Sequence, residues 1–198
     1  MDAIETLMSE HRNIERVCDA LSGFAEEIQR TGATEKEELS RFVTFVREYA
    51  DGQHHAKEEG VLFQEMVAHG FPSSGGPIAV MLHEHDASRG LVRALAAKAS
   101  QDGEWTAADR QEIAENAHGY ADLLRAHIHK EDAILYPMAL NRLPDEALEG
   151  VAERCAALDA GRADAAERLV ALAEELVTRH AHAVHPDAAP DPTGLDAR

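Results

Sequence analysis

The chain has little cysteine and no long apolar run. Its 198 residues include two cysteines, Cys18 and Cys155, and no C-x-x-C pair. Neither a disulfide framework nor a thiolate metal site is therefore expected. No segment approaches the roughly twenty uncharged apolar residues that cross a membrane, and the start lacks the basic and apolar regions of a signal peptide. These absences predict a cytoplasmic protein without a membrane span.

Positive charge is also scarce. The formal net charge is −18, from 19 Lys and Arg against 37 Asp and Glu, and no basic cluster occurs. Because nucleic-acid binding draws on clustered basic side chains that neutralise phosphates, no nucleic-acid partner is expected.

Aromatic residues make up only 5 % of the chain, and no stretch alternates with period two, whereas Ala, Leu and Glu are abundant. This composition predicts an all-α protein. Capping-box patterns at Asp2-x-x-Glu5, Thr34-x-x-Glu37 and Thr106-x-x-Asp109 begin three of four long helices, and Gly or Pro marks the breaks. The helices are expected at about residues 3–30, 34–69, 77–103 and 106–141. Their short connections predict an up-down-up-down four-helix bundle over residues 1–143.

Residues 144–198 follow a different pattern. Two further helices, at 145–160 and 162–184, are predicted either to pack on the bundle or to form a homo-oligomer contact. His180, together with His182 and His185, is predicted to lie at a frayed, solvated helix end rather than in a loose metal site. Residues 186–198 contain three prolines and little apolar content, which predicts a disordered tail.

One pattern of histidine and glutamate occurs twice. It consists of a single histidine followed, on the next helix, by His-x-x-x-Glu. Its members are His11, His54 and Glu58 in the first half of the bundle and His85, His127 and Glu131 in the second half. The two copies are 73 or 74 residues apart, so the bundle is interpreted as a duplicated two-helix unit.

All six residues of this repeat continue the apolar stripes of their helices, so their side chains are expected to face the interior of the bundle. A lone histidine or one His-x-x-x-Glu pair is more often structural, but the joint, duplicated occurrence favours a site. Buried without partners, these groups would cost several kcal/mol, and metal ions remove that cost. Imidazole and carboxylate without thiolate suit iron, manganese or zinc. Glu58 and Glu131 are the natural bridges between two ions about 3.5–4 Å apart.

The chain resembles the bacterial hemerythrin-like proteins of the HHE cation-binding class. The resemblance covers about residues 1–143, and its most specific segments are 54–59 (HHAKEE), 76–86 (GPIAVMLHEHD) and 127–137 (HIHKEDAILYP). It implies a four-helix bundle around a non-haem centre of two iron ions (Fe2+/Fe3+), bridged by carboxylates and an oxo or hydroxo group. Such a centre interacts with dioxygen or related small molecules.

One position departs from the oxygen-carrying hemerythrins. Their third helix has a second histidine four residues after the first, where this chain has Arg89, so a five-histidine site is not expected. Arg89 and the equivalent Glu15 are predicted to lie beside the site and to pair with a ligand carboxylate or with each other.

Neighbours of the six ligands are given lesser roles. On an ideal helix His55 and Glu59 lie away from the ligand face, so a solvated face is favoured over a role in supporting the ligands. Asp132 is a less favoured bridge than Glu131. Tyr136 is expected to fill the core rather than to contact the site.

Three functions remain open at this stage. The favoured one is a di-iron protein that binds or senses dioxygen, nitric oxide, peroxide or iron. The second is a di-iron enzyme that decomposes peroxide or reduces nitric oxide. The third is a zinc-loaded or metal-free helical interaction module.

Overall fold

The structure is a computed structural model that describes residues 3–180. Asp2 of the first predicted capping box, His182, His185 and the predicted tail at 186–198 lie outside the described residues.

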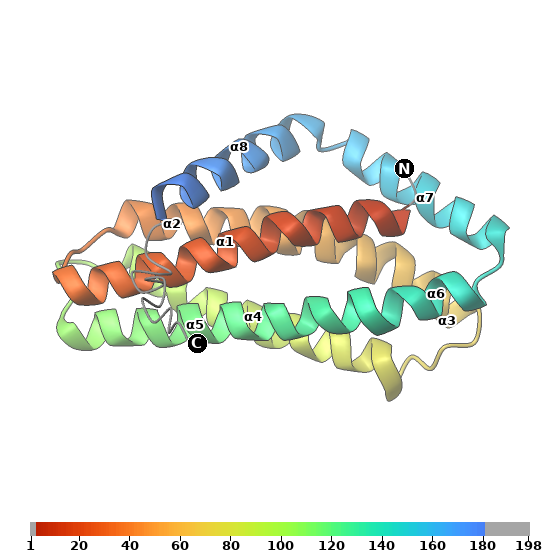
Figure 1. The fold of residues 1–198 in the computed structure, drawn as a ribbon, viewed down its shortest axis with the longest axis horizontal. Coiled ribbons are helices and arrows are strands. Elements are labelled where there is room, and N and C mark those ends of the chain that lie inside the picture. Colours follow the sequence, from red (N-terminus) through yellow and green to blue (C-terminus); the bar gives the residue numbers. More distant parts are fainter. Residues whose placement is uncertain (1–2, 181–198) are drawn as a thin grey trace, which may run out of the picture.

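Four long helical rods form the bundle, and the described residues contain no strand (Figure 1). The first rod is α1 (Ala3–Thr31) and the third is α4 (Gly76–Ser100). The second rod consists of α2 (Lys36–Phe45), η1 (Val46–His55), η2 (Glu58–Leu62) and α3 (Phe63–Ala68). The fourth consists of α5 (Ala107–Lys130), η3 (Glu131–Leu135) and α6 (Tyr136–Arg142). The all-α bundle fold is confirmed.

Local sequence explains where the rods begin and end. Gly32 ends the first rod with a φ of 73°, a left-handed conformation that glycine adopts without strain. The capping box at Thr106 is present, with both reciprocal hydrogen bonds to Asp109. The capping box predicted at Thr34 is wrong. The second rod begins at Lys36 without a side-chain cap, and the Thr34 hydroxyl instead accepts a hydrogen bond from the Trp105 backbone N–H at 3.0 Å.

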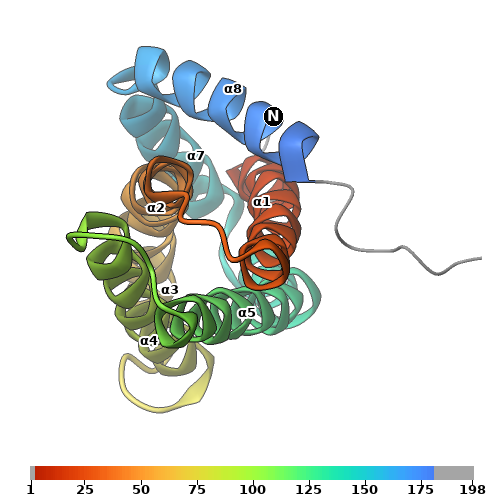
Figure 2. The same ribbon diagram turned by 90° about the vertical axis from the view of Figure 1, so that its left-hand side faces the viewer.

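The rods pack as antiparallel neighbours, with α5 against both α1 and α4, and α2 against α4 (Figure 2). Their apolar faces form two separate clusters along the bundle axis. One includes Leu21, Phe24 and Phe42, and the other includes Leu7 and Leu62. Between the two clusters lies a layer of buried polar side chains, which is where the repeated histidines and glutamates fall.

Three segments of the rods are π-helical, with backbone hydrogen bonds from residue i to residue i−5. The Phe63 N–H donates to the Glu58 carbonyl oxygen, and the Tyr136 N–H donates to the Glu131 carbonyl oxygen. These two segments, η2 and η3, occupy equivalent places in the two halves. The ten-residue segment η1 has no counterpart in the second half. Because a π-turn is wider than an α-turn, it changes which side chains downstream share a face.

Two further helices, α7 (Asp145–Ala160) and α8 (Ala163–His180), cross one side of the bundle (Figures 1 and 2). Helix α8 packs on α1 and α2, and α7 packs on α1 and η2. Of the two predicted roles, packing on the bundle is the one observed. A homo-oligomer contact through the outer faces of these helices stays a prediction.

The solvated helix end predicted for His180 is wrong. Its side chain is 4 % exposed, and Nε2 lies 2.9 Å from the Glu38 carboxylate. The ring lies 5.4 Å from that of Phe24 and 5.5 Å from that of Phe42. The apolar stripe of α8 runs to its described end, so the last turn is docked on the bundle.

Candidate metal centre

The six repeated residues lie together in the polar layer between the two apolar clusters. None of their side chains is more than 1 % exposed. The members are His11, His54, Glu58, His85, His127 and Glu131. Residues up to 120 positions apart in the chain are thus brought within reach of one another.

Each carboxylate contacts one histidine from each half. Glu131 Oε2 lies 3.2 Å from Nε2 of both His11 and His127. Glu58 Oε2 lies 3.6 Å from His54 Nε2 and 3.5 Å from His85 Nε2. The two glutamates therefore connect the halves across the bundle.

A fifth histidine, His55, joins the layer. It is 2 % exposed, and its ring stacks on that of His85 with centroids 3.8 Å apart. Potential ligand atoms within 4.8 Å of one another form two groups that share Glu58: His55, Glu58, His85 and His127, and His11, His54, Glu58 and Glu131. The solvated face predicted for His55, and the expectation that no five-histidine set occurs, are wrong.

The reason lies in η1, which ends at His55. In an ideal α-helix adjacent residues diverge by about 100°, which would turn His55 away from the face of His54. In η1 the wider turns place both rings in the interior, and the Ala56 N–H reaches back to the Asp51 carbonyl oxygen. Gly52, a glycine within a predicted helix, was the one local signal of this irregularity.

A carboxylate holds Nδ1 of every histidine in the layer. The partners are Asp132 for His11 (2.7 Å), Glu10 for His54 (2.9 Å), Asp51 for His55 (3.3 Å), Glu59 for His85 (2.7 Å) and Glu84 for His127 (2.9 Å). A hydrogen bond from Nδ1–H fixes the tautomer and leaves the Nε2 lone pair free for a metal. With the rings held in this way, Nε2 of His11 and of His127 faces Glu131, and Nε2 of His54 and of His85 faces Glu58.

The supporting carboxylates follow the sequence repeat. Glu10 and Glu84 each precede the single histidine of their half and hold the histidine of the His-x-x-x-Glu pair in that half. Glu59 and Asp132 each follow the glutamate of that pair and hold the single histidine of the opposite half. Glu59 thus supports a site histidine, the alternative that was less favoured from the sequence.

Arg89 contacts these supporting groups and not the central glutamates. Its guanidinium donates to Asp51 and Glu59, at 2.7 Å each, and to Asp86 at 3.0 Å. Glu15 pairs instead with Arg12 at 2.8 Å. The predicted pairing of Arg89 with a ligand carboxylate or with Glu15 is wrong, but Arg89 does lie beside the site, where it anchors the partners of His55 and His85.

Tyr136 contacts the site directly, contrary to the expectation of ordinary core packing. Its hydroxyl donates to Glu58 Oε1 at 2.6 Å, and its ring stacks on that of His11 with centroids 5.5 Å apart. The side chain is fully buried. It brings a hydroxyl donor from α6 to the group that contains His11.

Burial and mutual charge set the protonation of the layer. Burial lowers the pKa of His54 well below its usual value and that of His55 to about 3, so both rings are neutral, as metal ligation requires. Burial and then the charge of Glu131 raise the pKa of Glu58. Burial also favours protonated Glu131, but the neighbouring His11 and His127 rings, each 3.2 Å from its Oε2, outweigh burial and lower its pKa.

Several atoms at the centre of the layer have no hydrogen-bond partner among the described residues. They are Nε2 of His54, Nε2 of His55, Oε2 of Glu58 and both carboxylate oxygens of Glu131. An unsatisfied buried polar atom costs about 1–3 kcal/mol. Since all five are nitrogen or oxygen donors directed at one space, metal ions fit here, and ligation would remove the cost.

A helical bundle with a buried, carboxylate-supported layer of five histidines and two glutamates has the fold and the donor set of a metal-binding bundle protein. The family model for the hemerythrin HHE cation binding domain matches residues 2–139, and the chain belongs to this family. Comparison with curated proteins and with solved structures found no match. Among residues 3–180, no helix combines the length and apolar character that crossing a membrane requires.

Proposed function

We propose that this chain is a non-haem di-iron protein that binds or senses dioxygen, nitric oxide, peroxide or iron. The observation that carries the proposal is the set of five histidines, each held at Nδ1 by a carboxylate and each grouped with Glu58 in one of the two sets of potential ligand atoms. The family binds metal ions, and its domains bind small ligands.

The donor set supports two ions. His55, His85 and His127 with Glu58 would hold one, and His11 and His54 with Glu58 and Glu131 would hold the other. Because each glutamate already reaches a histidine from both halves, both are suited to bridging, together with the oxo or hydroxo group that the family resemblance implies. Imidazole with carboxylate suits iron, and both cysteines lie outside the two groups.

The surrounding residues would control access and proton supply. A bound iron pair supplies a redox-active centre for small molecules such as dioxygen, nitric oxide and peroxide. The apolar clusters on either side of the layer restrict water. The Tyr136 hydroxyl, hydrogen bonded to Glu58, is a buried proton donor within the layer. Burial and the neighbouring carboxylates raise the pKa of Tyr136, so this donor stays protonated at neutral pH.

Tyr136 also favours a second candidate function, an enzyme that decomposes peroxide or reduces nitric oxide. Reduction of nitric oxide consumes protons, and decomposition of peroxide moves protons between its oxygen atoms, so both reactions use a proton donor that a binding protein does not need. Steady turnover of peroxide, or of nitric oxide when an added chemical reductant supplies the electrons, would identify the enzyme if Tyr136→Phe lowers the rate with metal content unchanged.

We further propose a cytoplasmic location, since Cys18 and Cys155 are both free thiols.

The deciding experiment measures metal content per chain after production in iron-supplemented medium. The near-ultraviolet and visible spectrum is recorded before reduction, after anaerobic reduction and after exposure to air. Two irons per chain with a spectrum that changes reversibly would support the proposal. His54→Ala should abolish both the iron content and the spectral change. Protein that takes up no iron from this medium, or that retains only zinc, would refute it and leave the helical interaction module.

A further inference from the structure

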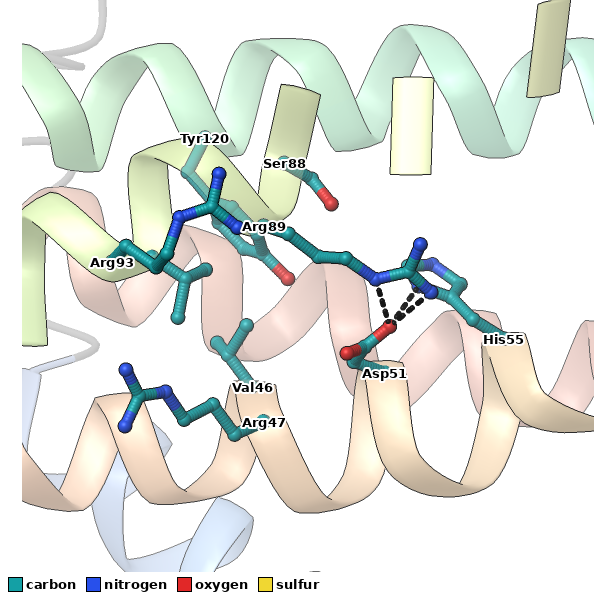
Figure 3. Close-up of a pocket in the computed structure, with 9 residues that line it drawn as sticks. Val46, Arg47, Asp51, His55, Ser88, Arg89, Arg93 and Tyr120 are labelled. Atoms are coloured by element: carbon teal, nitrogen blue, oxygen red, sulfur yellow. Dashed lines mark hydrogen bonds and ion pairs between the residues drawn. The ribbon is translucent and has the colours of Figure 1, made fainter. Parts of the chain in front are cut away.

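A pocket of about 360 Å³ opens beside the metal centre, between the second rod and α4. Its lining includes His55 and Asp51 on η1, Ser88 on α4, and Tyr120 on α5 (Figure 3). Val92 on α4 also lines it. His55 turns its Nε2 toward the metal layer and its Nδ1 toward Asp51. The pocket therefore lies on the outer side of a proposed ligand and is separate from the ligand cluster.

The charges of this pocket are opposite to those of the chain as a whole. Three guanidinium groups line it, those of Arg47, Arg89 and Arg93, with Asp51 as the single carboxylate, although the net charge of the chain is −18. Arg89 is neutralised by Asp51, Glu59 and Asp86.

The other two guanidinium groups are unpaired. Within residues 3–180, neither Arg47 nor Arg93 has an ion pair or a side-chain hydrogen bond. Figure 3 shows them on opposite walls, Arg47 on η1 and Arg93 on α4. Both are exposed, so their long side chains can adjust to a ligand between the walls. In an acidic protein, two unneutralised arginines at one pocket favour an anion.

The floor of the pocket adds an independent indication of a ligand. Tyr120 is 1 % exposed, and its hydroxyl has no hydrogen-bond partner among the described residues. Figure 3 shows the side chain reaching in from α5 with its hydroxyl between the two walls. A buried hydroxyl without a partner costs about 1–3 kcal/mol, which a ligand atom or an ordered water molecule would offset.

We infer that this pocket binds a small organic carboxylate. The anionic head group is held by Arg47 and Arg93, and the short apolar body packs against Val46, Val92 and the ring of Tyr120. The apolar walls favour an organic acid over an inorganic oxyanion. The inference does not require iron, since none of these groups is a proposed metal ligand.

Hexanoate is a suitable probe, with inorganic phosphate and uncharged hexanamide as comparison ligands. Binding is measured by isothermal titration calorimetry on the full chain, loaded with metal. Hexanoate should bind saturably, Arg47→Gln/Arg93→Gln should weaken it by about tenfold or more, and hexanamide should not bind measurably. Tyr120→Phe should lower the affinity for hexanoate by a smaller factor. Arg30→Gln is the matched control, because Arg30 is exposed at the end of α1 and outside the pocket, and it should change nothing.

The inference is overturned if hexanoate shows no saturable binding at about 10 mM, or if its affinity is equal in the wild type and the double arginine variant. Binding of phosphate without hexanoate would overturn the assignment to an organic acid. A repeat with metal-free protein separates this inference from the proposed function. Hexanoate binding that depends on the arginines in a chain that takes up no iron would support the pocket while the di-iron proposal fails.

Discussion

The two halves of the bundle are alike in the groups that hold the layer together and different in the groups added to it. Both have a carboxylate before the single histidine, a π-turn that begins at the glutamate of the His-x-x-x-Glu pair, and a supporting carboxylate directed at the opposite half. In the first half His55 adds a candidate ligand where the second half has Ile128. In the second half Tyr136 stacks on His11, as Phe63 stacks on His85, and adds a hydroxyl. The repeated pattern thus accounts for the framework, and the residues at which the halves differ would make the two proposed metal positions unequal.

The largest expected effect comes from the groups that the halves share. Glu58→Ala and Glu131→Ala should each reduce metal affinity by more than about 100-fold, since each glutamate reaches histidines of both halves. Metal content after dialysis against a chelator measures this. Glu26→Ala, on an exposed face of α1, is the control. Full metal content in either site variant would contradict the bridging roles.

Removing the fifth histidine should affect one metal position. His55→Ile makes the first half resemble the second half at this position. It should lower the affinity for one of the two bound ions by at least about tenfold and leave the affinity for the other unchanged. Competition with a graded chelator resolves the two ions. Ile128→Val, at the equivalent place, should retain both. Equal loss of both ions in His55→Ile would show that the two positions are not independent.

Equivalent lysines should differ in their contribution to stability. Lys57 is 1 % exposed between Glu10 and Asp159 of α7, whereas Lys130 pairs with Glu84 and is 33 % exposed. Lys57→Met removes the cation that pairs with the buried Glu10 carboxylate and should lower the free energy of unfolding by about 3 kcal/mol. Lys130→Met should lower it by less than about 1 kcal/mol. Denaturant unfolding of both variants tests the difference, and equal losses would contradict it.

A smaller, pH-dependent effect is expected at Glu38, where the second half has Gln111. Burial raises the pKa of Glu38, but hydrogen bonds from His180 and Arg41 outweigh burial and lower it below 4.5. Ionised Glu38 therefore contributes stability above pH 4.5, and this contribution is lost as the pH falls through the lowered pKa. Glu38→Gln should cost about 1 kcal/mol at pH 7, with a difference from wild type that shrinks below pH 4.5. Unfolding curves at pH 7, 5 and 3 measure it. A difference that is constant with pH would contradict the ionised pairing.

The sequence predicted the bundle because long apolar stripes and Gly or Pro breaks are local signals that the fold preserves. It also predicted that the six residues of the repeat would meet, because each of them continues the apolar stripe of its helix and that stripe faces the bundle interior. His55 was missed because an ideal α-helix would turn it away from the face of His54, and a π-turn depends on backbone hydrogen bonds that side-chain periodicity does not reveal. Tyr136 and His180 were missed because their partners, Glu58 and Glu38, come from distant helices.

The carboxylates that cross between the halves have a consequence for how the molecule forms. Glu59 of the first half orients His85 of the second, and Asp132 of the second orients His11 of the first. A half folded alone would have no carboxylate to hydrogen bond to Nδ1 of its single histidine. It would also lack one of the two central glutamates. A protein consisting of one half could complete such a centre only by pairing with another copy of itself. The fused chain instead makes assembly intramolecular, so the centre and the bundle are expected to form in one cooperative transition at any protein concentration.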